Sequence, residues 1–109
     1  MSWLVRDGDV LAVVEIADRA RGRRRGLLGR DGLEGAIVLR PCRHVHTFGM
    51  KFAIDVAFCD AEGLVLRTAS LAPWRLSPLV PRSAFVVEAE SGAFERWRLR
   101  PGDRLELRS

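Results

Sequence analysis

The sequence lacks tyrosine altogether, and its aromatic content is only 7%. A core for this 109-residue chain must therefore be built mainly from valine, leucine, isoleucine and alanine. No apolar run approaches the roughly 20 residues that a membrane-spanning helix needs, and the sequence contains no repeats or low-complexity segments. These absences argue against a helical membrane protein and a repeat protein, and the length predicts one domain over residues 1–109.

The N-terminal sequence also lacks the pattern of a secretory signal, in which positive charges precede an uninterrupted apolar segment. Arg6, Asp7 and Asp9 come before any long apolar stretch. We therefore expect a cytoplasmic protein in which Cys42 and Cys59 stay reduced. A disulfide between these two cysteines is the alternative.

Lysine is nearly absent, because all but one of the 18 basic residues are arginine. The net charge is +4, and arginine binds carboxylates and phosphates through two parallel hydrogen bonds, so the surface suits anionic partners. The arginines are spread from Arg6 to Arg108, however. The codon usage of a GC-rich bacterial genome therefore explains them better than a dedicated surface does.

Short β-rich segments separated by turn residues dominate the chain. Within 53–60, Ile54, Val56 and Phe58 alternate onto one face, and "DAEG" (60–63) has the Asp and Gly of a type I hairpin turn. We expect strands over 10–16, 35–41, 53–60, 64–72, 84–90 and 104–108, and short helices within 17–33 and 91–103. Three of the five prolines lie in 73–83, which predicts an ordered loop. The expected fold is mainly β with an α+β tendency: a small, mostly antiparallel β-barrel or sandwich with two short helices. The edges of such a sheet would allow a homodimer.

Residues 42–60 hold both histidines, both cysteines and the only lysine. The alternation of "RHVHT" (43–47) predicts a strand, on which Cys42, His44 and His46 would point to one face. Cysteine and histidine are good zinc ligands. The chain has no third histidine, and Lys51 stands where a further ligand would be needed. We therefore expect structural histidines and no metal or other cofactor, with these three residues as the metal alternative.

The two cysteines have different expected roles. Cys59 ends an apolar segment and is predicted to be a core residue. Cys42 lies beside Arg43, but no third group is placed to orient a Cys–His pair, so nucleophilic catalysis is not favoured.

A binding module without catalysis is the function that we favour. Its pocket would be formed by residues 44–51, with the proline-rich loop closing over it, since a tryptophan beside an arginine suits a small anionic or sugar-like ligand. A protein segment is the alternative occupant. The candidate ligand-binding residues are His44, His46, Met50, Lys51, Asp55, Trp74 and Arg75. In a purely structural alternative, Asp55 bonds a neighbouring backbone group and has Lys51 as its partner.

Two other function classes remain open. In an enzyme, His44, His46 and Asp55 are the groups suited to proton transfer, and His46 and Asp55 would have to share one cavity. Nucleic acid could instead bind the basic run made of Arg19, Arg21, Arg23, Arg24 and Arg25. No aromatic residue interleaves with that run, so a solvated helix face is the preferred interpretation. We expect no membrane partner.

Several motifs resemble those of the DUF192 family of uncharacterised prokaryotic proteins. They are "RGRRRGLLGRDGLEGAIVL", "TFGMKFAIDVAFCDAEGLVL" and "FVVEAESGAFERWRLRPGD", and together they cover roughly residues 20–107. The most specific block is Phe48-Gly49-Met50-Lys51 followed by Asp55, with Glu88, Gly92, Gly102 and Asp103 downstream. Many members have Trp-Met-Lys-Asn in the central motif, whereas this chain has Gly49 and Phe52 in place of the Trp and the Asn. The resemblance implies a compact, mainly β fold and no established activity.

Overall fold

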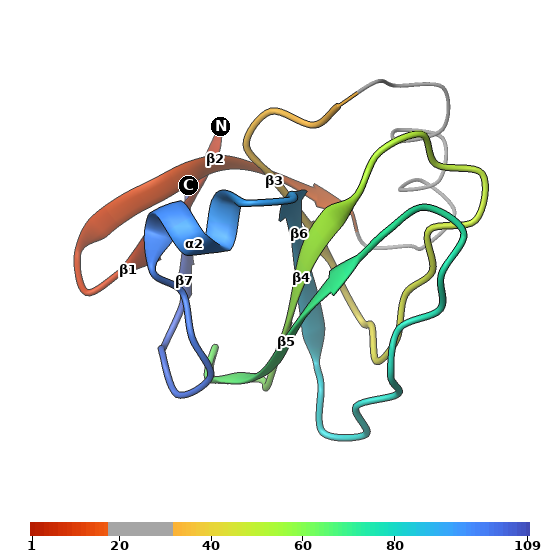
Figure 1. The fold of residues 1–109 in the computed structure, drawn as a ribbon. Coiled ribbons are helices and arrows are strands. Elements are labelled where there is room, and N and C mark those ends of the chain that lie inside the picture. Colours follow the sequence, from red (N-terminus) through yellow and green to blue (C-terminus); the bar gives the residue numbers. More distant parts are fainter. Residues whose placement is uncertain (18–31) are drawn as a thin grey trace.

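A computed structural model describes residues 1–17 and 32–109, and its central feature is one seven-stranded sheet (Figure 1). The strands lie in the order β5-β4-β6-β3-β2-β1-β7. The elements are β1 (Ser2–Arg6), β2 (Asp9–Ala17), β3 (Ala36–Leu39), β4 (Ile54–Cys59), β5 (Val65–Leu71), β6 (Phe85–Glu90), α2 (Ala93–Trp97) and β7 (Glu106–Arg108). The mainly β fold expected from the sequence is confirmed.

Tight turns place neighbouring strands side by side. Asp7 and Gly8 both have positive φ, of 52° and 83°, and join β1 to β2 as a two-residue hairpin loop. Between β4 and β5, the N–H of Gly63 donates to the carbonyl of Asp60 at 3.0 Å, which closes the turn expected from the sequence. The strand pairs are antiparallel except for β2 and β3, so the mostly antiparallel sheet is confirmed.

The sheet curls until the start of β5 meets the segment that leads into β7. The N–H of Val65 donates to the carbonyl of Asp103 at 2.8 Å, and the N–H of Leu105 donates to the carbonyl of Gly63 at 2.8 Å. A side chain at Gly63 would overlap the carbonyl of Leu105, so only glycine allows this approach. The result is a half-barrel in which α2 lies across the hollow of the curl (Figure 1).

Each face of the sheet carries its own apolar cluster. The inner cluster lies between the curled sheet and α2 and includes Val38, Ala57, Cys59 and Phe94. The outer cluster lies beneath the loops 40–53 and 72–84. Its buried members are Leu33, Ile37, Leu39, Val45, Met50, Ile54, Val56, Phe58, Leu71 and Val86. Alternate residues of β4 supply the two clusters, as the pattern of 54–58 predicted, and every residue of β4 is buried.

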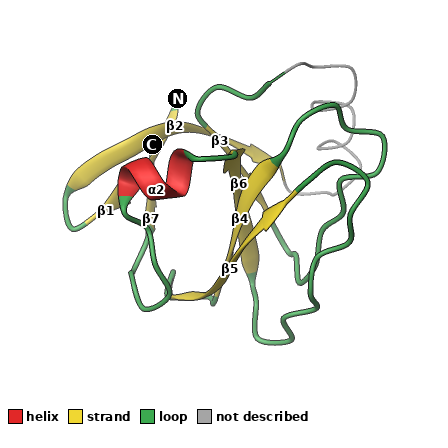
Figure 2. Cartoon of the chain, in the orientation of Figure 1, coloured by secondary structure: helices red, strands yellow, loops and turns green. Residues whose placement is uncertain are grey.

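One of the two expected helices is confirmed. It is α2, a short helix within the segment 91–103 (Figure 2). The described residues contain no second helix, and the one expected within 17–33 falls on residues 18–31, outside the described part of the chain. Figure 2 also shows that the long loops gather on one side of the sheet, away from α2.

Candidate functional site

Residues 42–51 form a loop, and the strand expected there from the alternation of "RHVHT" is wrong. Its only β-type pairing is an isolated antiparallel bridge between His46 and Leu76. Cys42 is partly buried and its thiol donates to the carbonyl of His44 at 3.1 Å, while the side chain of His44 is exposed. Cys42, His44 and His46 therefore do not share the face of a strand. Among the described residues, no three His, Cys, Asp or Glu side chains gather as a metal ion would require.

A buried threonine ties this loop to the proline-rich loop. Thr47 is completely buried, and its N–H donates to the carbonyl of Arg75 at 2.8 Å while its carbonyl accepts from the N–H of Trp74 at 2.9 Å. Its hydroxyl donates to the carbonyl of Ala72 at 2.6 Å and accepts from the N–H of Arg75 at 2.8 Å. Four hydrogen bonds from one residue therefore fix the two loops against each other.

A second polar contact holds the same two loops in register. The N–H of Val45 donates to the hydroxyl of Ser77 at 2.8 Å, and the N–H of Ser77 donates back to the carbonyl of Val45 at 2.9 Å. Both residues are buried, so these backbone groups are satisfied inside the protein. The loops are therefore ordered as a unit.

Three rings stack on the outside of this joined pair of loops. The ring centroids of His46 and Phe48 are 4.7 Å apart, and those of Phe48 and Trp74 are 6.3 Å apart, with interplanar angles of 24° and 29°. Phe48 is 46% exposed and Trp74 is 64% exposed. The N–H of Phe48 donates to Nδ1 of His46 at 3.2 Å, which requires a neutral imidazole. We call these three residues the aromatic stack.

Trp74 reaches the stack through an unusual backbone conformation. Its φ is 64°, in the left-handed region that bulky residues rarely adopt. The hydrogen bonds that Thr47 makes with Trp74 and Arg75 hold this conformation in place. Such strain persists only where the surroundings enforce it, and it is often associated with function.

The remaining candidates are dispersed. Met50 is 6% exposed and packs in the outer cluster, so it supports the loop from below. Lys51 and Arg75 are exposed on the same two loops. Asp55 points to the inner face of the sheet, where its Oδ2 accepts from the N–H groups of Gly92 and Phe94 at 3.0 and 3.1 Å. Asp55 therefore binds the start of α2, on the face opposite the aromatic stack.

Sequence reasoning missed two residues of this site, Thr47 and Phe48. Both lie inside the motif that carries the family resemblance, which was the available signal. What could not be read from the sequence is the partner of each, because Trp74 and Arg75 lie more than 20 residues further along the chain.

Both cysteines are free thiols, so the alternative of a disulfide between them is wrong. Cys59 is completely buried, which confirms its prediction as a core residue. Burial raises the pKa of its thiol to about 12, and the nearby charge of Asp60 adds to this rise. The thiol of Cys59 therefore stays protonated and inert at neutral pH.

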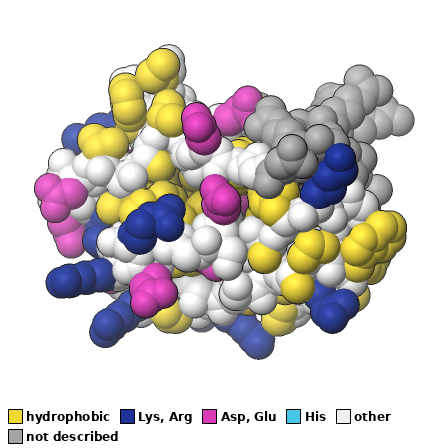
Figure 3. Space-filling model, turned by 45° about the horizontal axis from the view of Figure 1, so that its top comes forward, with side chains coloured by type: hydrophobic (Ala, Val, Ile, Leu, Met, Phe, Trp, Pro, Cys, Tyr) yellow, Lys and Arg dark blue, Asp and Glu magenta, His cyan; other side chains and the backbone are white. Residues whose placement is uncertain are grey.

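Charges of both signs are interspersed on the face seen in Figure 3, and neither sign forms a continuous patch there. The two loops of the site differ from that mixture. Residues 40–53 and 72–84 contain no aspartate or glutamate, and their basic residues are Arg40, Arg43, Lys51, Arg75 and Arg82. The five arginines predicted for nucleic acid, from Arg19 to Arg25, lie outside the described residues.

Comparison with known proteins agrees with these motifs. The model of the DUF192 family, described as uncharacterised ACR, matches residues 3–107. The chain belongs to the DUF192 family. A UPF0127 protein of Pyrococcus horikoshii is 28% identical over 98 residues, which are 85% of this chain and 85% of that protein.

Two crystal structures have the same fold as this DUF192 protein. One is a protein of unknown function from Novosphingobium aromaticivorans, with a TM-score of 0.79, 21% identity, and coverage of 96% of this chain and 82% of that one. The other, from Sinorhizobium meliloti, is provisionally described as a transcription regulator, with a TM-score of 0.76, 21% identity, and coverage of 96% and 90%. No helix in the described part of this chain is long and apolar enough to cross a membrane.

Several family motif residues of this DUF192 protein have structural tasks. Gly92 has a φ of 98° and gives its N–H to Asp55. Oδ2 of Asp103 accepts from the N–H of Arg100 and from the guanidinium of Arg6, each at 3.0 Å. Glu88 is completely buried, between Ile37 and Val56 in the sheet register. Of the residues in the most specific block and its downstream partners, all of which lie in the described part of the chain, only Phe48 and Lys51 present exposed side chains.

Proposed function

We propose that this DUF192 protein is a binding module without catalysis, and that the aromatic stack holds a small anionic, sugar-like ligand. The observation that carries the proposal is Trp74, a tryptophan that is 64% exposed and held at positive φ by hydrogen bonds to a buried threonine. A large apolar side chain displayed on an ordered loop is typical of a recognition surface.

The stack offers the ligand a preorganised apolar face. Phe48 stacks with both His46 and Trp74, and the indole of Trp74 is the most exposed of the three rings. A sugar ring has an apolar C–H face that packs on an aromatic face and polar groups at its rim. Because Thr47 already orders both loops, little conformational entropy is lost on binding.

The charge of the two loops favours an anionic ligand. Lys51 and Arg75 have exposed side chains and lie close to Phe48 and Trp74 in the sequence. Neither loop contains an acidic residue. A carboxylate or phosphate on the sugar would find cations there and no like charge. We also place the protein in the cytoplasm, since two free thiols fit a reducing compartment.

Catalysis is disfavoured by the position of the acidic group. An enzyme based on His46 and Asp55 needs both at one reacting centre. Asp55 lies on the inner face of the sheet, where it accepts hydrogen bonds from the start of α2. The two loops themselves contain no carboxylate. The histidines therefore serve as ring and hydrogen-bonding groups in this proposal.

Single-stranded nucleic acid is a second candidate for the same surface. Bases stack on exposed aromatic rings, and basic loops contact phosphates. We rank it second because the two exposed rings, Phe48 and Trp74, stack on each other, whereas such proteins present separate rings to several successive bases.

A fluorescence titration tests the proposal. The variant Trp3→Phe/Trp97→Phe keeps Trp74 as the only tryptophan, and the probes are glucuronate, glucose 6-phosphate and a twelve-residue oligothymidylate. We expect saturable quenching by at least one sugar probe. In the native background, Trp74→Ala should abolish binding in calorimetry, and Lys51→Gln and Arg75→Gln should each weaken it several-fold in a salt-dependent manner.

Trp3→Ala is the matched control, because Trp3 is also exposed but lies on β1. It should bind the sugar probe as the native protein does. Equal binding by Trp74→Ala and the native protein would overturn the proposal. Saturable binding of the oligothymidylate alone would replace the sugar-like ligand with nucleic acid.

A further inference from the structure

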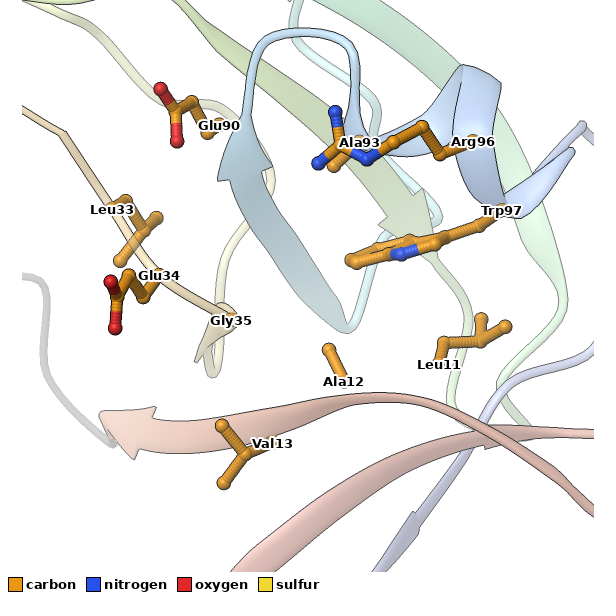
Figure 4. A pocket seen from close by; sticks show the side chains of 10 residues that line it. All are labelled: Leu11, Ala12, Val13, Leu33, Glu34, Gly35, Glu90, Ala93, Arg96 and Trp97. Carbon is orange, nitrogen blue, oxygen red and sulfur yellow. The ribbon is translucent and has the colours of Figure 1, made fainter.

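A groove of about 500 Å³ lies between α2 and β2 (Figure 4). The loops that carry the aromatic stack lie on the side of the sheet away from α2 (Figure 2). Leu11, Ala12 and Val13 of β2 form one wall, and Trp97 and Arg96 of α2 form the wall opposite. The volume is within the range of ligand sites in proteins. This groove is independent of the proposed function, since it shares no residue with it.

The groove exists because β3 is much shorter than β2. β2 has nine residues and β3 has four, and only the second half of β2, Val14–Ala17, pairs with β3. Within the described residues, no strand pairs with that edge of β2 over residues 9–13. The edge of β2 at residues 9–13 therefore offers backbone N–H and C=O groups to another chain, except for the carbonyl of Val13, which lies against Gly35.

A β-bulge shapes the same stretch of β2. Leu4 pairs with Ala12 and Val5 pairs with Val10, so Leu11 is the extra residue on β2. Bulges locally increase the twist of a strand and redirect a side chain. Here the bulged residue is one of those that line the groove.

The charged groups at the groove are mainly acidic, in contrast to the net charge of +4 for the whole chain. Figure 4 shows Glu34 and Glu90 at the end of the groove away from α2, whereas Arg96 lies beside Trp97 on α2. Cationic side chains of a bound chain could pair with these carboxylates, and an aliphatic stem could pack on the indole of Trp97.

We propose that this groove binds an extended basic peptide, which pairs with β2 at residues 9–13 as an added strand. The unpaired backbone of β2 supplies the main-chain hydrogen bonds, and Glu34 and Glu90 select a lysine or arginine side chain of the peptide. A second copy of this chain fits less well, because pairing two β2 edges would bring the same acidic groups together.

The probe is a capped hexapeptide of alternating valine and lysine, titrated into the full-length protein by calorimetry. The hydrogen–deuterium exchange of the protein is followed in parallel. We expect saturable binding and slower exchange at residues 10–13, with no change at 14–17, which are already paired with β3. The same peptide with glutamate in place of lysine should not bind.

Exposed residues allow charge variants that do not disturb the fold. The variant Glu34→Gln/Glu90→Gln should weaken binding at least tenfold, while Glu62→Gln/Glu95→Gln, which also removes two exposed carboxylates, should bind as the native protein does. Equal affinity in both double variants would overturn the charge selection that the proposal requires.

Strand pairing has its own test, because an added strand uses the N–H groups of alternate residues. Two versions of the peptide are N-methylated, one at the valines and one at the lysines. One version should lose binding and the other should keep it. If both bind as the parent peptide does, no strand is added and the proposal fails. A dimer in sedimentation, with residues 10–13 already protected in the free protein, would overturn it in favour of a second copy.

Discussion

At the scale of single residues, Thr47 connects the family motif to the exposed surface. It is completely buried and forms its hydrogen bonds to Ala72, Trp74 and Arg75 at the point where two loops cross. No local pattern in the sequence marks a threonine for this task, because its partners come from a distant segment. The position of Thr47 therefore emerges only from the folded chain.

Thr47→Val should lower the free energy of unfolding by about 1–3 kcal/mol, since it keeps the shape and removes the hydroxyl. The N–H of Arg75 and the carbonyl of Ala72 would lose their buried partner. Denaturant unfolding measures the loss, and Thr47→Ser, which keeps the hydroxyl, is the control. Equal loss in both variants would mean that the methyl group, not the hydrogen bonding, supports the loops.

Asp55 was predicted either as a ligand-binding residue or as a group that bonds neighbouring backbone. Its Oδ2 receives two N–H groups at the start of α2, so Asp55→Ala should cost about 1–3 kcal/mol of stability and leave ligand binding at the aromatic stack unchanged. Thermal unfolding and the sugar titration measure the two effects separately. If Asp55→Ala folds with native stability but no longer binds the sugar probe, Asp55 belongs to the ligand-binding site.

Cys59 predicts how stability depends on alkaline pH. The folded protein keeps the thiol protonated to about pH 12, whereas the unfolded chain loses the proton near the ordinary pKa of 9.0. Between these values the unfolded state binds fewer protons, so the free energy of unfolding should fall as the pH rises through this window. Cys59→Ala, which cannot ionise, should show a shallower alkaline decline in urea unfolding. Parallel curves for the two proteins would contradict the raised pKa.

At the scale of elements, alternation in the sequence located the strands well. The residues of β4 alternate between two buried clusters, and the turn from Asp60 to Gly63 returns the chain onto β5 as expected. The failure at residues 42–51 has a physical reason. The alternating residues there do not form a strand. His46 makes a single bridge to Leu76 and Val45 is buried, and these two isolated contacts account for the pattern.

Closure of the half-barrel can be tested at its narrowest contact. Gly63→Ala should destabilise the protein by roughly 2 kcal/mol or more, because φ is 89° and the new Cβ would meet the carbonyl of Leu105. Gly102→Ala is the matched control, with a φ of 97° and open space around it. The difference between the two in chemical unfolding measures the steric overlap alone. Equal losses would mean that the two ends of the sheet are not held closely together.

At the scale of the whole molecule, the sequence predicted a small, mostly antiparallel β fold with a site in the family motif. It could not predict the parallel pairing of β2 with β3 or the separation of Asp55 from His46, because both follow from how distant strands assemble. The aromatic stack lies on the loop side of the assembled sheet, and an open edge of β2 lies beside α2.

The central claim is that the aromatic stack is the ligand-binding surface. The protein contains three tryptophans, at positions 3, 74 and 97, so the three indole N–H signals in a ¹H–¹⁵N correlation spectrum report on three separate regions. During titration with glucuronate or glucose 6-phosphate, the signal of Trp74 should shift in a saturable way while those of Trp3 and Trp97 stay in place. A Trp74 signal that does not move at saturating ligand would contradict the claim.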